Sequence, residues 1–191
     1  MIASGRGEHA RSGEMPVKWA SRGEKMLTRD QLTDDQWRTV RNTPHHVAIA
    51  VSAVGGSIFD EMLERSAAMA GIVDASNNRH PLVQGIGASA DIMAAQDQLR
   101  AWYHGLDDSE RHAANLQAKA LATFKDAVRI LAERGQNDDV RPYCDFVIGL
   151  ANRVARSARE GDMLGVGGEL VSSGERTFIA LLEAATSANG R

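Results

Sequence analysis

The stretch DDVRPYCDFVIGLANRVARSAR at residues 138–159 decides the fold of this chain. Its apolar residues return every three or four positions, a spacing that places them along one face of an α-helix. The residues predicted to face the core are Val140, Tyr143, Val147, Leu150, Val154 and Ala158. Such a stripe predicts a long helix that packs against other helices.

The segments on either side follow the same helical spacing. Residues 107–135 predict a helix that ends at Gly135 after a basic last turn. Its expected core positions are Leu116, Ala120, Phe124, Ala127 and Leu131. A last helix is predicted to begin near Ser172 and to bring together Phe178, Leu181, Leu182 and Ala185.

The N-terminal half also predicts helices. Thr33 and Gln36 form a capping-box pattern, so a short helix should begin there and carry Trp37 and Val40 inward. We expect NTP at 42–44 to interrupt this helix and Pro44 to open another. Further helices are predicted over 57–72 and, after a loop at 74–81, from Pro81 to Tyr103.

No segment alternates apolar and polar residues over a strand's length, which favours an all-α fold. We predict an irregular bundle of about six or seven helices without a β-sheet. Residues 1–28 are too polar to bury and are expected to form a disordered tail, with Met26 as an alternative initiator. Residues 29–188 should form a single helical domain.

The composition excludes several classes of protein. Among the 191 residues, 43% are hydrophobic and 25% charged, and the net charge of −3 gives no basic footprint for nucleic acid. No apolar run is long enough to span a membrane, and the N-terminus lacks the apolar region of a signal peptide. The single cysteine fits a reducing compartment, so we expect a cytoplasmic protein.

Two glycine-rich stretches could suggest a ligand. The loop GDMLGVGGELVSSGE at 161–175 lacks side-chain oxygens where a calcium loop needs them and lacks the Lys-Ser/Thr pair of a phosphate loop. Its end, Ser172 to Glu175, forms a capping box, which favours a structural turn. GIGASA at 85–90 matches a dinucleotide fingerprint but follows no strand, so a helix face of small residues is the better interpretation.

The only metal candidates are weak. They are His45 and His46, with Asp60, Glu61 and Glu64 as ligands if the two helices pack antiparallel. Cys144 lies on the apolar stripe and is expected to be buried and inert. We predict no catalytic residue and no cofactor.

Two segments carry a resemblance to a known family. They are Trp37 with NTPHHVAIAVSAVGGSIFDEMLE at 42–64, and AREGDMLGVGGELVSSGERTFIALLEA at 158–184. Together they resemble a family of small all-helical bacterial proteins of unknown function, over most of residues 34–186. The chain departs from that family at VGGS, 54–57, where members often show an Asp-Pro-Ser-Gly-like turn. The resemblance implies a compact helical domain and no established activity.

Three hypotheses for function follow. The first is a non-enzymatic module that acts through a protein partner or by self-association, with the helix at 44–54 and the small residues around Gly85, Ala88 and Ser89 as candidate interfaces. The second is a small-molecule or metal-ion binder related to stress, and no small-molecule ligand is identified. The third is an enzyme whose acid–base residues come from separate helices.

Overall fold

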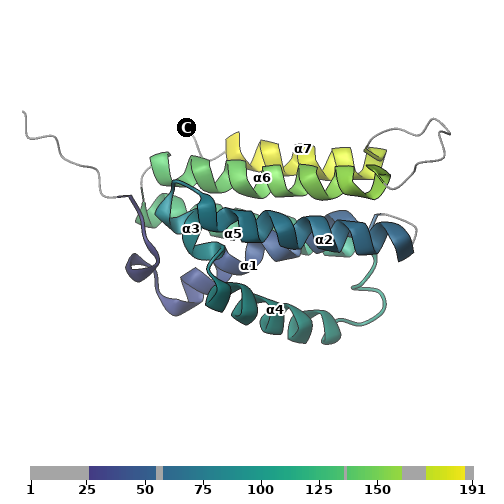
Figure 1. The fold of residues 1–191 in the computed structure, drawn as a ribbon, viewed down its shortest axis with the longest axis horizontal. Coiled ribbons are helices and arrows are strands. Elements are labelled where there is room, and N and C mark those ends of the chain that lie inside the picture. The colour runs from purple at the N-terminus through teal and green to yellow at the C-terminus, as the bar shows by residue number, and fades with distance from the viewer. Residues whose placement is uncertain (1–25, 55–57, 136, 161–170, 188–191) are drawn as a thin grey trace, which may run out of the picture.

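The computed structural model describes residues 26–54, 58–135, 137–160 and 171–187, and for 58–64, 137 and 158–160 it describes the backbone alone (Figure 1). The described residues form seven α-helices and no strand. The prediction of an all-α bundle is therefore confirmed. In chain order the elements are η1 (Arg29–Gln31), α1 (Asp34–Ser52), α2 (Ile58–Asp74), η2 (Ala75–Asn77), α3 (Pro81–Ile86), α4 (Ser89–His104), α5 (Ala113–Arg134), α6 (Asn137–Glu160) and α7 (Ser173–Ser187).

Helix α1 lies at the centre of the bundle. It packs against α2, α5 and α6, while α2 also lies along α6 and α7 covers α5 and α6. Helix α4 lies at the edge of the molecule, on α1 (Figure 1). Of the helices that the structure describes, none is long and apolar enough to cross a membrane.

The apolar stripes predicted for the two long helices lie in the core. In α5 all five expected positions are buried. In α6 Tyr143, Val147, Leu150 and Val154 are buried and Val140 is half-buried, while the side chain of Ala158 lies outside the described residues. Helix α7 buries Phe178, Leu182 and Ala185 as expected, but Leu181 is 48% exposed. Successive residues of a helix point about 100° apart, and Leu181 falls outside the arc of α7 that holds Phe178, Leu182 and Ala185.

The predicted break at residues 42–44 is wrong, because α1 is one helix with Pro44 inside it. Proline lacks the N–H that would bond the carbonyl four residues earlier, here that of Val40. The Tyr143 hydroxyl of α6 donates a hydrogen bond to this carbonyl oxygen at 3.0 Å. A side chain from another helix therefore supplies the donor that Pro44 lacks, and the helix continues.

The single helix predicted from Pro81 to Tyr103 is also wrong, because the chain breaks between α3 and α4. A Cβ atom on Gly87 would lie 2.1 Å from the backbone nitrogen of Ser76, so the chain passes too close to η2 for any side chain. A Cβ on Gly85 would lie 3.2 Å from the Trp37 ring. The glycines of GIGASA, at 85–90, thus allow η2 and the Trp37 indole ring to lie close to this segment.

Two boundaries also differ from the predictions. Residues 26–28 were assigned to the tail, yet Leu27 is 2% exposed and belongs to the core. Helix α5 begins at Ala113 and not near 107, because Asp107 and Glu110 close a turn by exchanging backbone-to-carboxylate hydrogen bonds of 2.8 and 3.0 Å. It ends at Gly135 as predicted, where the Gly135 N–H donates to the Leu131 carbonyl.

Candidate functional site

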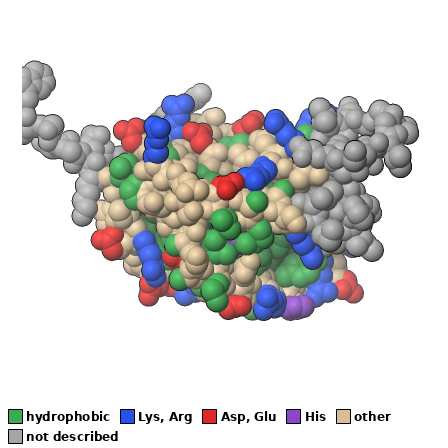
Figure 2. Space-filling view, viewed as in Figure 1, with side chains coloured by type: hydrophobic (Ala, Val, Ile, Leu, Met, Phe, Trp, Pro, Cys, Tyr) green, Lys and Arg blue, Asp and Glu red, His purple; other side chains and the backbone are tan. Residues whose placement is uncertain are grey.

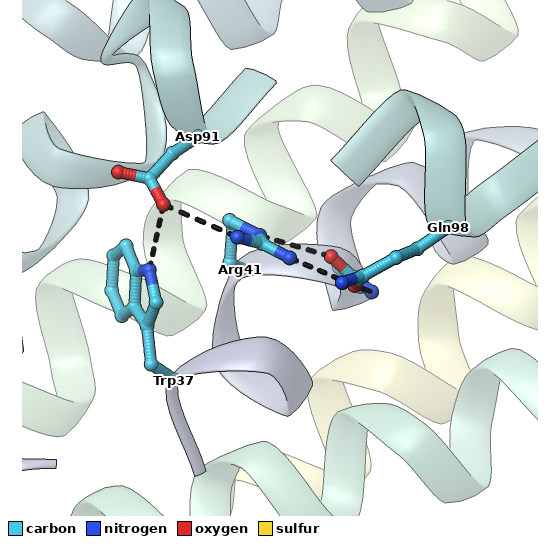
Figure 3. Close-up of polar contacts among 5 residues, drawn as sticks. Trp37, Arg41, Asp91 and Gln98 are labelled. Atoms are coloured by element: carbon cyan, nitrogen blue, oxygen red, sulfur yellow. Dashed lines mark hydrogen bonds and ion pairs between the residues drawn. The ribbon is translucent and has the colours of Figure 1, made fainter. Parts of the chain in front are cut away.

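A buried polar network joins α1 to α4 (Figure 3). Its centre is the Asp91 carboxylate, whose Oδ1 accepts a hydrogen bond from Trp37 Nε1 at 2.8 Å and one from the Arg41 guanidinium at 3.3 Å. The side chains of Arg41 and Asp91 are only 8% and 12% exposed. We call the set Trp37, Arg41, Asn42, Asp91 and Gln98 the α1–α4 polar network.

The network continues one turn further along α1 and two turns further along α4. Arg41 donates to Gln98 Oε1 at 2.8 Å and to Asn42 Oδ1 at 3.1 Å, and Asn42 Nδ2 donates to the same Gln98 oxygen at 2.7 Å. Since Trp37 meets Asp91 and Arg41 meets Gln98, the two helices run in the same direction. The amide and guanidinium donors thus fix the register of α4 on α1.

This network is suited to holding helices together. A buried charge is costly unless it is paired and hydrogen-bonded, and here Arg41 and Asp91 neutralise each other, while the Trp37 indole donates to Asp91 and the amide oxygens of Asn42 and Gln98 accept from Arg41. Asp91 also stands in the first turn of α4, where a negative charge is stabilised by the helix dipole. The arrangement explains how an edge helix with few buried apolar residues stays in place.

The two histidines proposed as metal ligands lie one turn beyond Arg41. His45 is 4% exposed, and no hydrogen-bond partner of its Nε2 is found within the described structure. Burial first, and then the charges of His46 and Arg41, lower the His45 pKa from 6.5 to about 4. Burial likewise lowers the His46 pKa to about 4, and its ring packs on Trp102 at 4.5 Å between centroids. Both imidazoles are therefore neutral at physiological pH.

The structure does not test whether these histidines share a metal with α2. The side chains of Asp60, Glu61 and Glu64 lie outside the described residues. Within the part of the chain that is described, no group of three His, Cys, Asp or Glu side chains is placed to hold a metal ion. The proposed ligands Asp60, Glu61 and Glu64 thus stay a prediction from sequence.

A second buried pair joins α3 to α6. Asp139, in the first turn of α6, accepts hydrogen bonds from His80 Nε2 at 3.0 Å and from the Leu27 N–H at 2.6 Å. The side chains of His80 and Asp139 are each 5% exposed. This carboxylate thus fastens both the start of the described chain and the N-cap residue of α3 to α6.

Neither Cys144 nor Tyr143 is activated for chemistry. Burial, helped by the nearby Asp145 carboxylate, raises the pKa of the Cys144 thiol to about 12. Burial also raises the pKa of Tyr143 far above its usual value. The predicted inert cysteine agrees with this environment, because a thiol acts as a nucleophile only when it ionises.

The loop at 161–170 lies outside the described residues, but its final turn is described. The Ser172 N–H donates to Glu175 Oε2 at 2.7 Å, and the Glu175 N–H donates to Ser172 Oγ at 3.2 Å. The predicted capping box is therefore present and occupies donors at the start of α7.

Two parts of the surface are candidates for partners. A shallow groove between α6 and α7 is lined by Asn152, Val171, Arg176, Ile179, Ala180 and Glu183. Apolar side chains also gather on the face between α2 and α4 (Figure 2). Five large apolar residues of the described chain are exposed: Met93 of α4 at 66%, Val73 of α2 at 49%, Met26 at 48%, Leu181 of α7 at 48% and Tyr103 of α4 at 37%.

Sequence reasoning missed the α1–α4 polar network and the His80–Asp139 pair. A signal for the first was present, since Trp37, Arg41 and His45 recur every four residues and so share one face of a helix. Polar residues that fall on a buried stripe need partners, and this spacing predicts a polar contact with a neighbouring helix. The partners, Asp91 and Gln98, could not be named from the sequence, because the position of α4 depends on the break between α3 and α4.

The described residues define an all-α bundle with two buried polar clusters, the α1–α4 polar network and the His80–Asp139 pair. No family model matches the chain, and searches of curated proteins and of solved structures likewise gave no match.

Proposed function

We propose that this protein is a non-enzymatic helical module that acts through protein–protein contact, self-association included. The observation that carries the proposal is the exposure of large apolar side chains on three separate helices, at Val73, Met93 and Leu181. Contiguous apolar surface on a domain often marks a binding face, and Figure 2 shows apolar side chains gathered between α2 and α4.

The buried ionisable groups support the same proposal. Asp91 and Asp139 each accept hydrogen bonds that tie one element to another. Groups that serve packing in this way are poorly placed to take up and release protons during a reaction. We further propose a cytoplasmic location and membership of the family of small helical bacterial proteins that the two quoted segments resemble.

Native mass spectrometry of the untagged full-length protein tests this function. We expect multiples of the 20.6 kDa chain without additional mass. A reproducible adduct of one small molecule or metal ion per chain would instead favour a ligand-binding protein. Chemical cross-linking at physiological salt then locates the faces in contact.

Metal-ion or small-molecule binding is the second candidate, and the buried Nε2 of His45 favours it. Neutral imidazole is the form that binds a metal, and His45 and His46 are both held neutral. Titration with Zn²⁺ or Ni²⁺, followed by calorimetry on the intact protein and on His45→Asn, tests this directly. Equal heats for the two proteins would rule out His45 as a ligand.

A further inference from the structure

We propose that a second copy of this chain docks on the outer face of α7, in a two-fold antiparallel arrangement that pairs Arg176 with the partner's Glu183. This inference rests on the proposed function and names the surface through which the chain self-associates.

The outer face of α7 carries small side chains between its two edges. Phe178, Leu182 and Ala185 turn inward, while Thr177, Ala180 and Ala184 point to solvent. Their small side chains allow a second helix to come close, as in tightly packed helix pairs. The groove between α6 and α7 adjoins this face at Ala180 and adds Asn152 of α6 to it.

Opposite charges stand at both ends of one edge of this face. Arg176 and Glu183 are seven residues apart, which on a helix places them about 20° apart around the axis and about 10 Å apart along it. Both are exposed and both line the groove. Arg176 also interacts within its own chain, and the partner's carboxylate would add to that contact.

This pattern is complementary to itself. A two-fold axis perpendicular to α7, passing beside Ile179 and Ala180, reverses the helix and sets Arg176 opposite the partner's Glu183. The same operation sets Glu183 opposite the partner's Arg176, so both charge pairs form at once. An isologous contact of this kind closes as a dimer and does not propagate into a fibre.

Leu181 gives the other edge of the face its apolar contact. It lies about 140° around the helix from Arg176, and it is 48% exposed in the single chain. Because the two-fold axis passes close to it, Leu181 and the partner's Leu181 come together on that edge. The dimer therefore buries one of the few large apolar side chains that the single chain leaves in solvent.

The expected dimer is weak. One helix and one groove wall offer less surface than the roughly 1,200–2,000 Å² of a stable interface, which is typical of transient contacts. We therefore expect the dimer to dissociate on dilution. Sedimentation equilibrium from the micromolar to the millimolar range measures its dissociation constant on the full-length chain.

Charge reversal tests the arrangement. Arg176→Glu and Glu183→Arg should each weaken dimerisation at least about tenfold, because each replaces two attractive pairs with two repulsive ones. The double variant that carries both changes should return to within about threefold of the parent chain. Leu181→Asp should also weaken the dimer at least about tenfold. Arg100→Glu, an exposed change on α4, is the matched control and should have no effect.

Three outcomes would overturn the inference. A chain that stays monomeric into the millimolar range refutes the dimer, while the proposed contact with a different protein stands. A dimer unaffected by Arg176→Glu, Glu183→Arg and Leu181→Asp self-associates through another face, which supports the proposed function and refutes this surface. Loss of dimer in both single reversals without recovery in the double variant refutes the pairing. Circular dichroism and melting temperatures confirm that each variant is folded.

Discussion

Replacing Tyr143 by phenylalanine removes the side-chain hydroxyl and keeps the aromatic ring. The ring stacks on Phe124 with centroids 6.5 Å apart, and Tyr143 is 0% exposed. The hydroxyl donates to the Val40 carbonyl at 3.0 Å, and Val40 is also 0% exposed. Without it, a buried carbonyl that lacks the helical donor of residue 44 also loses the hydrogen bond from Tyr143.

We expect Tyr143→Phe to lower the free energy of unfolding by about 1–3 kcal/mol, the cost of leaving a buried polar group unsatisfied. For a chain of this size that corresponds to roughly 2–4 °C in melting temperature for each kcal/mol. Urea unfolding followed by far-ultraviolet circular dichroism measures the free energy directly.

A double-mutant cycle isolates the physical cause. Pro44→Ala restores an N–H that can reach the Val40 carbonyl, so in that background Tyr143→Phe should cost less, by about 1 kcal/mol. Changes in the unfolded chain caused by losing proline cancel in the cycle. Tyr103→Phe, on a side chain that is 37% exposed, is the matched control and should change stability by less than about 0.5 kcal/mol. Strictly additive effects of Tyr143→Phe and Pro44→Ala would refute the compensation.

Four further predictions follow from the packing. Asp91→Ala should cost about 3–5 kcal/mol because it leaves Arg41 buried without its counter-charge, whereas Asp97→Ala, in an exposed pair with Arg100, should be nearly neutral in the same urea experiment. Gly87→Ala should destabilise by at least about 1 kcal/mol through its clash with Ser76, while Gly149→Ala, with nothing within 4 Å, should stabilise α6 by about 0.5–1 kcal/mol. Because the pKa values of His45 and His46 fall from 6.5 to about 4 on folding, the unfolded chain binds more protons in this window, and the free energy of unfolding should decrease as pH falls from 6.5 to 4. A pH series of urea unfolding curves measures this slope, which should flatten in His45→Asn. Cys144 should react with a thiol reagent such as dithionitrobenzoate only in denaturant, and rapid labelling of the native protein would contradict its burial.

Most of the helices could be predicted from the periodic spacing of apolar residues in the sequence. Stripes such as Val147–Leu150–Val154 in α6 can be seen in sequence because burial on one face imposes a spacing of three and four residues. The capping boxes at Thr33 and Ser172 were also readable, since each depends on residues three positions apart. These features are local, and a local pattern is sufficient to predict them.

The errors at Pro44 and Gly87 and the missed polar network come from contacts between residues of different elements. Pro44 predicts a break until Tyr143, from α6, supplies the missing donor. Gly87 looks like part of a helix until the backbone of Ser76 comes to lie against it. The α1–α4 polar network needed Arg41, Asp91 and Gln98 to be brought together, and spacing along the chain does not specify that meeting.

The hydrogen bond between Tyr143 and Val40 spans 103 residues, and this separation has a consequence during synthesis. Ribosomes add about 5–20 residues per second, so Val40 is made roughly 5–20 s before its donor Tyr143. Throughout that interval the turn around Pro44 has an open carbonyl that water alone can satisfy. The nascent N-terminal helix should therefore fray at its middle and become continuous only when α6 is complete. Helix α6, which is made late, thus supplies the hydrogen bond that keeps α1, which is made first, continuous.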